Sequence, residues 1–140
     1  MSNLDTIKAI EDNLSAIIAA QGFMLEDSST DPERTTKPLC ALRHTGEDFG
    51  DEYGQKPDYN DLKYTLRISF SDPAPGTTRD KTAEWCHKIR NNVTVNALNV
   101  DVLAVSKLVS LVTHEGYSIT GEGPPETDIE YRLRVRYRET

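Results

Sequence analysis

The sequence Ile129-Glu130-Tyr131-Arg132-Leu133-Arg134-Val135-Arg136-Tyr137-Arg138 alternates apolar or aromatic residues with charged ones, without interruption. Successive side chains of a β-strand point to opposite faces of a sheet, so this pattern predicts a strand. One face of the strand would enter a core, and the other would carry the four arginines. Because the chain has a formal net charge of -7, this arginine row needs acidic partners, either within the chain or on another molecule.

Length and composition limit the class of protein. A chain of 140 residues is long enough for one domain with a core. With 36% hydrophobic and 28% charged residues, we expect a thin core and long polar loops. The excess of 23 Asp and Glu over 16 Lys and Arg argues against a protein whose main task is to bind nucleic-acid phosphates.

The sequence carries no sign of secretion or of a membrane span. The N-terminus lacks a basic region followed by a continuous apolar run, and no stretch approaches the roughly twenty apolar residues of a transmembrane helix. Cys40 and Cys86 lack the spacing of metal ligands. We therefore expect reduced, buried cysteines in a protein made in a cytoplasm.

Two amphipathic helices are predicted. The first covers residues 4–20, where apolar residues recur at steps of three and four, and Gly22 follows it as a terminating residue. The second covers residues 78–95, where Trp85, Ile89 and Val93 recur every four residues. Its apolar stripe is narrow, so we expect this helix to lie on a sheet.

Further strands are predicted at residues 38–44 and 62–70, and from about Leu103 through Val112 to Ile119, with an irregularity at Gly116. A helix over the first part of the third segment is the competing interpretation. Residues 121–125 read as a turn before the arginine strand, which would be an edge or near-edge hairpin partner.

These elements predict an α+β fold with a single domain over residues 1–140. An antiparallel or mixed sheet of about four to five strands would have both helices on one face. The residues expected in the core are Leu14, Ile17, Leu66, Ile68, Phe70, Trp85, Ile89, Leu133 and Val135.

The segment from Thr45 to Asp61 shows no periodicity and is rich in acids, with aromatic residues at 49, 53 and 59. We interpret it as a long acidic loop or arm. A loop this long in a compact domain is either functional or disordered, and its aromatic content favours an arm that becomes ordered on a partner.

Candidate catalytic and metal-binding patterns are weak. No two of His44, His87 and His114 share a helix face or stand at ligand spacing beside a carboxylate. Cys86 and His87 are adjacent on a helix and would point about 100° apart, which is poor geometry for a nucleophile and its base. The acidic loop lacks the alternation of a calcium-binding loop. We therefore expect no catalytic residue, no metal and no cofactor.

The arginine row has two interpretations. It is either a solvated sheet face paired with acids of the same chain, or a basic surface that docks on an acidic one, such as the acidic arm of an identical neighbour. The residues expected at such a contact are Arg132, Arg134, Arg136, Arg138, Arg67, Lys63, Asp48, Asp51, Glu52, Phe49 and Tyr53.

Nearly the whole chain resembles the tail terminator and tail completion proteins of tailed bacteriophages. The resemblance rests on the order and spacing of the opening helix, the strands at 38–42 and 64–70, the Trp85-bearing helix, the run 108–117 and the terminal alternating strand. It implies a small α+β subunit of a hexameric ring in the neck of the virion, which packs on the last ring of tail tube protein and contacts the head-tail connector or stopper protein. DNA would pass through the lumen without specific binding. The acidic arm is longer than in compact members of this family.

Two alternatives remain beside this resemblance. A head-closure or adaptor protein of the same neck would differ mainly in its partner. A small nucleic-acid-binding module using the arginine strand belongs to a different class, and the net charge of -7 argues against it.

Overall fold

The structure is a computed structural model that describes residues 2–25, 38–50, 59–71, 78–104, 106–121 and 126–139. Its elements in chain order are α1 (Asn3–Ala20), β1 (Met24–Leu25), β2 (Leu39–Phe49), β3 (Tyr59–Ser71), α2 (Thr78–Asn92), α3 (Val95–Leu98), the 3-10 helix η3 (Asp101–Leu103), β4 (Val109–Gly121) and β5 (Glu126–Arg138).

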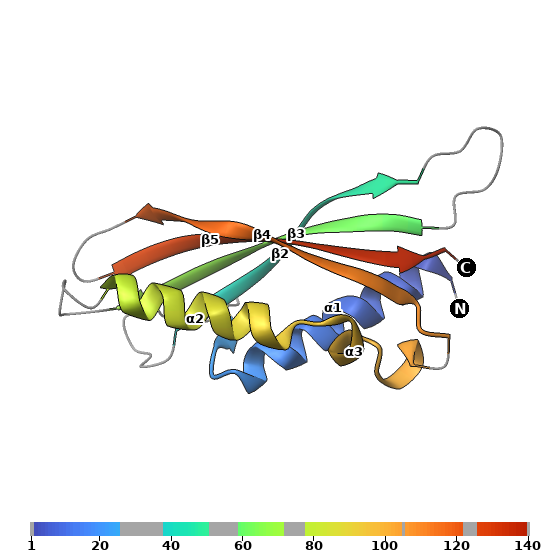
Figure 1. Ribbon diagram of the computed structural model, residues 1–140, viewed down its shortest axis with the longest axis horizontal. Helices are drawn as coiled ribbons and strands as arrows, with labels where there is room; N and C mark the ends of the chain where they lie inside the picture. Colours follow the sequence, from blue (N-terminus) through green and yellow to red (C-terminus); the bar gives the residue numbers. More distant parts are fainter. Residues whose placement is uncertain are drawn as a thin grey trace.

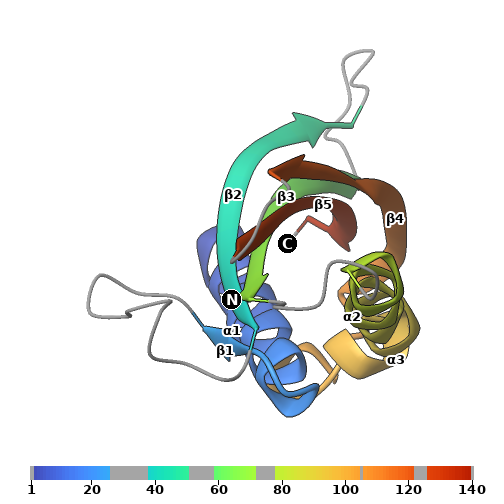
Figure 2. The same ribbon diagram turned by 90° about the vertical axis from the view of Figure 1, so that its left-hand side faces the viewer.

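One five-stranded sheet organises the molecule, in the order β1-β2-β3-β5-β4. The short β1 pairs in parallel with β2, and the other neighbours are antiparallel. Figure 1 shows the helices on one side of the sheet. Figure 2 shows the sheet curling around them, with β2 and β4 at its two sides. The predicted α+β class, with a mixed sheet and helices on one face, is confirmed.

The central strand β5 alternates between buried and accessible residues along its whole length, and β3 does so except at Ser69, which is buried between Ile68 and Phe70. Their register places Leu62 opposite Val135 and Ile68 opposite Ile129, so the apolar side chains of both strands share the face that the helices cover. The terminal alternating segment is therefore a strand, as predicted. It lies one strand in from the sheet edge, because β4 pairs along its other side.

The first helix begins with a capping box, in which the Ser2 hydroxyl accepts a hydrogen bond from the backbone N–H of Asp5 and the Asp5 carboxylate accepts one from that of Ser2. Its buried residues include Ile10, Leu14 and Ile18. After its end, Gly22 adopts a φ of +99°, a left-handed conformation that suits glycine.

Most of the residues expected in the core are buried by the contact of helices and sheet. The buried ones are Leu14, Leu66, Ile68, Phe70, Ile89, Leu133 and Val135. Ile17 and Trp85 are partly buried against this cluster. The Trp85 ring packs edge-on to Phe23 with centroids 5.0 Å apart, and the Lys88 ammonium lies 4.4 Å from its centroid.

The acidic segment was predicted wrongly in part. Strand β2 continues to Phe49 and β3 begins at Tyr59, so both ends of the expected loop are paired strands. Sheet hydrogen bonds and cross-strand charge pairs stabilise these ends although they lack an apolar alternation. Residues 51–58, in the middle of the expected arm, lie outside the described residues.

Two other boundaries also differ from the prediction. The second helix ends at Asn92 instead of Val95, and Thr94 caps the separate helix α3. The strand expected from Leu103 begins at Val109, because η3 and a turn precede it.

The irregularity expected at Gly116 is present as a register shift between His114 and Gly116. Most of the expected turn at 121–125 lies outside the described residues.

Within the described part of the chain, no helix is long and apolar enough to cross a membrane.

Candidate functional site

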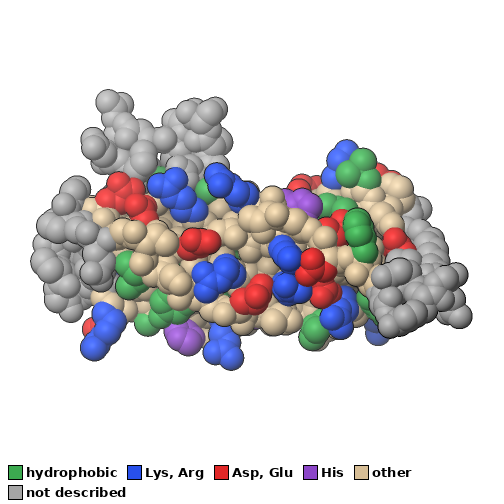
Figure 3. Space-filling view, turned by 90° about the horizontal axis from the view of Figure 1, so that it is seen from above, with side chains coloured by type: hydrophobic (Ala, Val, Ile, Leu, Met, Phe, Trp, Pro, Cys, Tyr) green, Lys and Arg blue, Asp and Glu red, His purple; other side chains and the backbone are tan. Residues whose placement is uncertain are grey.

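The sheet face that points away from the helices, here called the outer face, is rich in charged side chains. Figure 3 shows this side of the molecule, with basic and acidic side chains interspersed over the strands. The register puts Asp61 opposite Arg136 and Lys63 opposite Arg134 on β3 and β5. Asp61 and Arg136 thus carry opposite charges directly across from one another, whereas Lys63 and Arg134 are both positive and share the Asp48 carboxylate, at 3.0 and 3.1 Å.

Arg134 is the centre of this charge network. Its guanidinium lies 3.1 Å from the Asp48 carboxylate on β2, 3.6 Å from that of Asp61 on β3 and 3.4 Å from that of Glu115 on β4. One arginine thus joins the three other long strands to β5. Arg136 makes a forked pair with Asp61, through hydrogen bonds of 2.8 and 3.2 Å.

The ionisation of these groups reflects the network. A hydrogen bond from Lys63, together with the positive charges of Lys63 and Arg134, lowers the pKa of Asp48. A hydrogen bond to Asp61, and the charge of that carboxylate, raises the pKa of Arg136. Both effects keep the pairs charged at neutral pH. Because the groups are exposed to solvent and salt, each pair stabilises the fold only slightly.

The other arginines on the outer face are bound less strongly. Arg138 donates a hydrogen bond to the carbonyl of Ser106, and Arg67 lies 4.0 Å from Asp128. Neither Arg132 nor Arg43 forms a hydrogen bond or ion pair through its side chain with any residue that the structure describes. Thr65 of β3 pairs with Arg43 of β2 on one side and with Arg132 of β5 on the other. The two arginines therefore lie in one row across the sheet.

The aromatic residues of the expected arm lie where β2 and β3 meet residues 51–58. Phe49 is 74% exposed and Tyr59 is 45% exposed. Figure 1 shows this end of the two strands rising away from the helix layer. The remaining residues expected at a contact, Asp51, Glu52 and Tyr53, lie outside the described residues.

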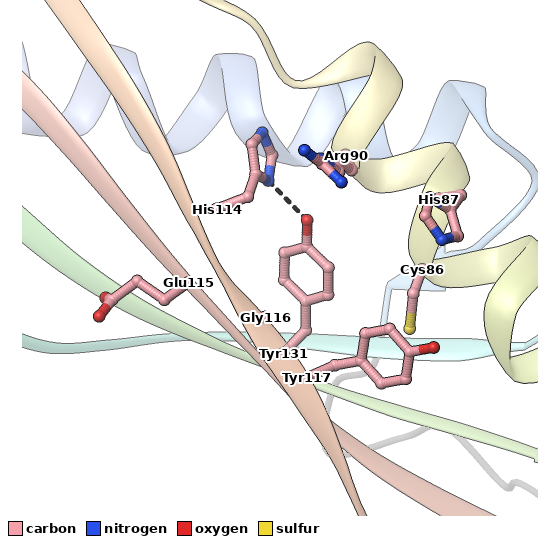
Figure 4. A pocket seen from close by; sticks show the side chains of 8 residues that line it. All are labelled: Cys86, His87, Arg90, His114, Glu115, Gly116, Tyr117 and Tyr131. Atoms are coloured by element: carbon pink, nitrogen blue, oxygen red, sulfur yellow. Dashed lines mark hydrogen bonds between the residues drawn. The ribbon is translucent and has the colours of Figure 1, made fainter.

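A cleft between α2 and β4 was not anticipated from the sequence. Its volume is about 200 Å³, and Figure 4 shows its lining of α2, β4 and β5 side chains: Cys86, His87, Arg90, His114, Glu115, Gly116, Tyr117 and Tyr131. The spacing of His87 and Arg90 by three residues on one helix places both along the same side of α2. This three-residue spacing can be recognised in the sequence, but the sequence does not show which strand packs beside that side of α2.

At the inner end of the cleft, His114 of β4 makes hydrogen bonds to β5 and to the residue that follows α2. Its Nδ1 lies 2.5 Å from the Tyr131 hydroxyl and its Nε2 lies 2.9 Å from the Val93 carbonyl. A carbonyl can only accept, so Nε2 carries the proton and Nδ1 accepts from the tyrosine. Burial lowers the pKa of His114, against a smaller raising effect of the Val93 carbonyl, so the neutral ring is favoured.

The cleft does not fit thiol chemistry. Burial raises the pKa of the Cys86 thiol to about 12, so the thiolate that would act as nucleophile is scarcely populated at neutral pH. His114 is already occupied by Tyr131 and Val93, and Figure 4 shows His87 directed away from the sulfur.

The outer part of the cleft carries polar groups without a partner among the described residues. The side chains of Arg90, His87 and Tyr117 form no hydrogen bond or ion pair there. Glu115 belongs to the cleft lining but bonds to Arg134 on the outer face, and Figure 4 shows its carboxylate directed away from Arg90. The cleft therefore presents the positive charge of Arg90 and the imidazole of His87 beside the exposed ring of Tyr117, whereas Tyr131 is 2% exposed.

A second polar cluster lies on the helix side of the sheet, at the end of β3 and β5 that also carries the Asp61–Arg136 pair. The Tyr137 hydroxyl donates to Glu47 at 2.5 Å and accepts from the Asn60 amide at 3.3 Å, and Asn60 also donates to Glu139. Burial, followed by the hydrogen bond to Glu47, raises the pKa of Tyr137 to about 12. Together these bonds connect the chain end to β2 and β3.

Among the described residues, no group of three or more His, Cys, Asp or Glu side chains could hold a metal ion. Neither protein-family models nor the sequences of curated proteins give a match to this chain.

Proposed function

We propose that the protein is a structural subunit of a tailed bacteriophage, a tail terminator that forms a ring, caps the tail tube and joins it to the head-side connector. The ring would be a hexamer, as the resemblance of the sequence implies. A head-closure or adaptor protein of the same neck is the nearest alternative.

The observation that carries this proposal is the exposed aromatic pair on the β2–β3 hairpin. Phe49, at 74% exposure, and Tyr59, at 45%, lie at the end of paired strands instead of in the core. Exposing large apolar side chains on a rigid element is unfavourable in water unless a partner covers them. A hairpin with two exposed aromatic side chains suits a subunit whose neighbours cover those side chains after assembly.

The outer face supports an assembly subunit over a nucleic-acid-binding module. Asp48, Asp61 and Glu115 neutralise Arg134 and Arg136 on the same face. A surface that binds phosphates needs an excess of basic groups, and these carboxylates would repel the nucleic-acid backbone. The mixed charges instead suit a surface that lies near DNA or protein without binding DNA tightly.

The proposal is tested by adding the purified protein to tail tubes that lack a terminator. We expect rings about six copies in size at the tube ends in negative-stain images, and tubes of fixed length that join to heads. Binding to heads without tubes would indicate the head-closure alternative, and binding to neither would contradict the proposal.

A further inference from the structure

We propose that the open edge of β4 pairs with the same edge of a second copy of this chain, as antiparallel strands related by a two-fold axis at Ser118. The contact goes beyond the proposed function and does not depend on it. A two-fold contact uses the same surface on both copies and is complete with two copies, so it is separate from the head-to-tail contacts that a ring needs.

Only part of the β4 edge is open. β4 is the outermost strand on one side of the sheet. Its first residue is closed off within the chain, because the Asn99 amide donates to the Val109 carbonyl at 2.8 Å and accepts from the Val109 N–H at 2.9 Å. Figure 1 shows the other end of β4, at upper left, clear of the helices. No residue that the structure describes forms a hydrogen bond with the backbone on the free side of residues 116–120.

The opposite edge of the sheet is protected. The short β1 pairs with the first residues of β2, and the His44 ring bonds to the Gly46 carbonyl at 2.8 Å. β2 also carries the charged residues Arg43, Glu47 and Asp48. Charged side chains and covering segments discourage pairing between sheet edges. β2 is therefore a poor template for another strand.

The β4 edge lacks this protection. Residues 110–121 contain no lysine, arginine or proline, and their one carboxylate, Glu115, lies 3.4 Å from Arg134 of the same chain. Tyr117 is 38% exposed and Ile119 is 41% exposed, and both are residue types that favour strands. An exposed edge with apolar side chains and almost no charge is a template for another strand.

The side chains at the open edge select one register and one occupant. Pairing with β5 puts Tyr117 and Ile119 on the helix side and Ser118 on the outer face. Two paired strands keep their faces only when residues of the same face are opposite one another. An axis at Ser118 puts Tyr117 opposite Ile119 of the second copy, twice, and pairs of aromatic and β-branched residues stabilise a sheet. Because residues 117–119 complement themselves in this way, a second copy is the partner that fits.

The same register separates the charges of the two copies. An axis at Ser118 puts Glu115 opposite Gly121 of the second copy, and the two Glu115 carboxylates are then about 20 Å apart along the strands. Moving the axis to Tyr117 would instead put the charged Glu115 opposite the apolar Ile119. The charge pattern therefore favours the axis at Ser118.

The contact is short. Register shifts between His114 and Gly116, and between Ile119 and Gly121, interrupt the edge on both sides. Such irregularities bend and twist a strand. Residues 116–120 of each copy therefore pair, which gives an interface at the small end of specific contacts. We expect a reversible dimer whose population rises with protein concentration.

The test introduces Ser118→Cys into the full-length protein and oxidises it with diamide. Cysteines at the axis are opposite one another at a separation that a disulfide can bridge, so we expect a covalent dimer on non-reducing gels. The natural Cys40 and Cys86 are buried and do not compete.

Ser110→Cys is the matched control, because Ser110 is exposed on the same strand but far from the axis. Its dimer should form about ten-fold more slowly, since distant cysteines cannot be bridged within the paired dimer. Equal rates of dimer formation in Ser118→Cys and Ser110→Cys would overturn the inference.

A charge at the edge tests the register. Adding Ile119→Lys to Ser118→Cys should slow dimer formation about ten-fold, because a lysine on an edge strand opposes pairing. Leu111→Lys, at a residue 43% exposed on the same strand but outside the paired stretch, should slow it less than about two-fold. Circular dichroism checks that each variant is folded. Equal slowing by the two lysines would contradict the register.

Hydrogen exchange tests the pairing in the unmodified protein. Backbone N–H groups on the free side of residues 116–120 should exchange several-fold more slowly at high protein concentration than at low concentration. Those at the β2 edge, residues 43–45, should not change. Exchange at 116–120 that does not depend on concentration would overturn the inference.

Discussion

Arg134 and Asp48 are 86 residues apart in the chain and lie 3.1 Å apart on the outer face, with β3 between their strands. The contact depends on two strand registers at once, that of β2 on β3 and that of β3 on β5. A shift of one residue in either would turn one of the two side chains to the helix side of the sheet. The pair therefore reports whether three strands are correctly aligned.

This alignment gives the first prediction. Arg134→Ala should lower the free energy of unfolding by about 1 kcal/mol, because it leaves Asp48, Asp61 and Glu115 close together without their shared cation. Arg132→Ala, on the same strand and face, should lower it by less than about 0.5 kcal/mol. Urea unfolding at low and high salt measures both, and salt should reduce the difference. Equal losses would show that the network adds no stability.

His114 gives a prediction for pH. Its folded-state pKa lies below its ordinary value of 6.5, so the unfolded chain binds the proton more strongly. Stability should therefore fall as the pH decreases from about 7 through 6.5, and this fall should continue until the folded-state pKa is reached. The measurement is urea unfolding at a series of pH values between 7 and 5.

His114→Gln should be less stable at pH 7, because the bonds to Tyr131 and Val93 are altered, but it should lack this pH-dependent step. His87→Gln changes an exposed side chain of the same cleft and should retain the step. An unchanged pH profile in His114→Gln would show that other groups cause it.

Gly116 gives a prediction for backbone conformation. It has a φ of +114° at the register shift of β4, and an added Cβ would meet no atom within 4 Å. The cost of Gly116→Ala is therefore backbone strain without a clash, and should be about 1–3 kcal/mol of unfolding free energy. Gly46→Ala, at the β2 register shift without a positive φ, should cost much less. Similar losses in thermal or urea unfolding would contradict this explanation.

The partial burial of Trp85 lowers the stability loss that we expect for its replacement by alanine. A fully buried tryptophan would cost about 3–5 kcal/mol on replacement by alanine, and the sequence pattern suggests such a position. Because the ring is partly exposed and packs on Phe23, we expect Trp85→Ala to lose about 2 kcal/mol and to remain folded. Ile89→Ala, one turn further and fully buried, should lose at least as much. Unfolding of Trp85→Ala under native conditions would show a larger structural role.

The class of fold follows from local patterns in the sequence. The alternation at 129–138 and at 62–70, and the helical spacing at 4–20, each predict one element whose apolar side must be covered. The alternation failed at 45–49 and 59–61, where the residues form strand because their backbones pair across β2, β3 and β5, and charge pairs of Asp48 and Asp61 with Arg134 and Arg136 add a small stabilisation. That stabilisation comes from residues far along the chain, so no local pattern reveals it.

The sequence by itself determined which side chains of each element are apolar and which are charged, because residue spacing fixes the faces of helices and strands. The tertiary structure alone decided the partners. The order β1-β2-β3-β5-β4 placed the arginine row among carboxylates of three other strands, and packing α2 beside β4 brought Arg90, His114 and Tyr117 together. Strand order and helix placement depend on the burial of the whole core, a sum over contacts between distant segments.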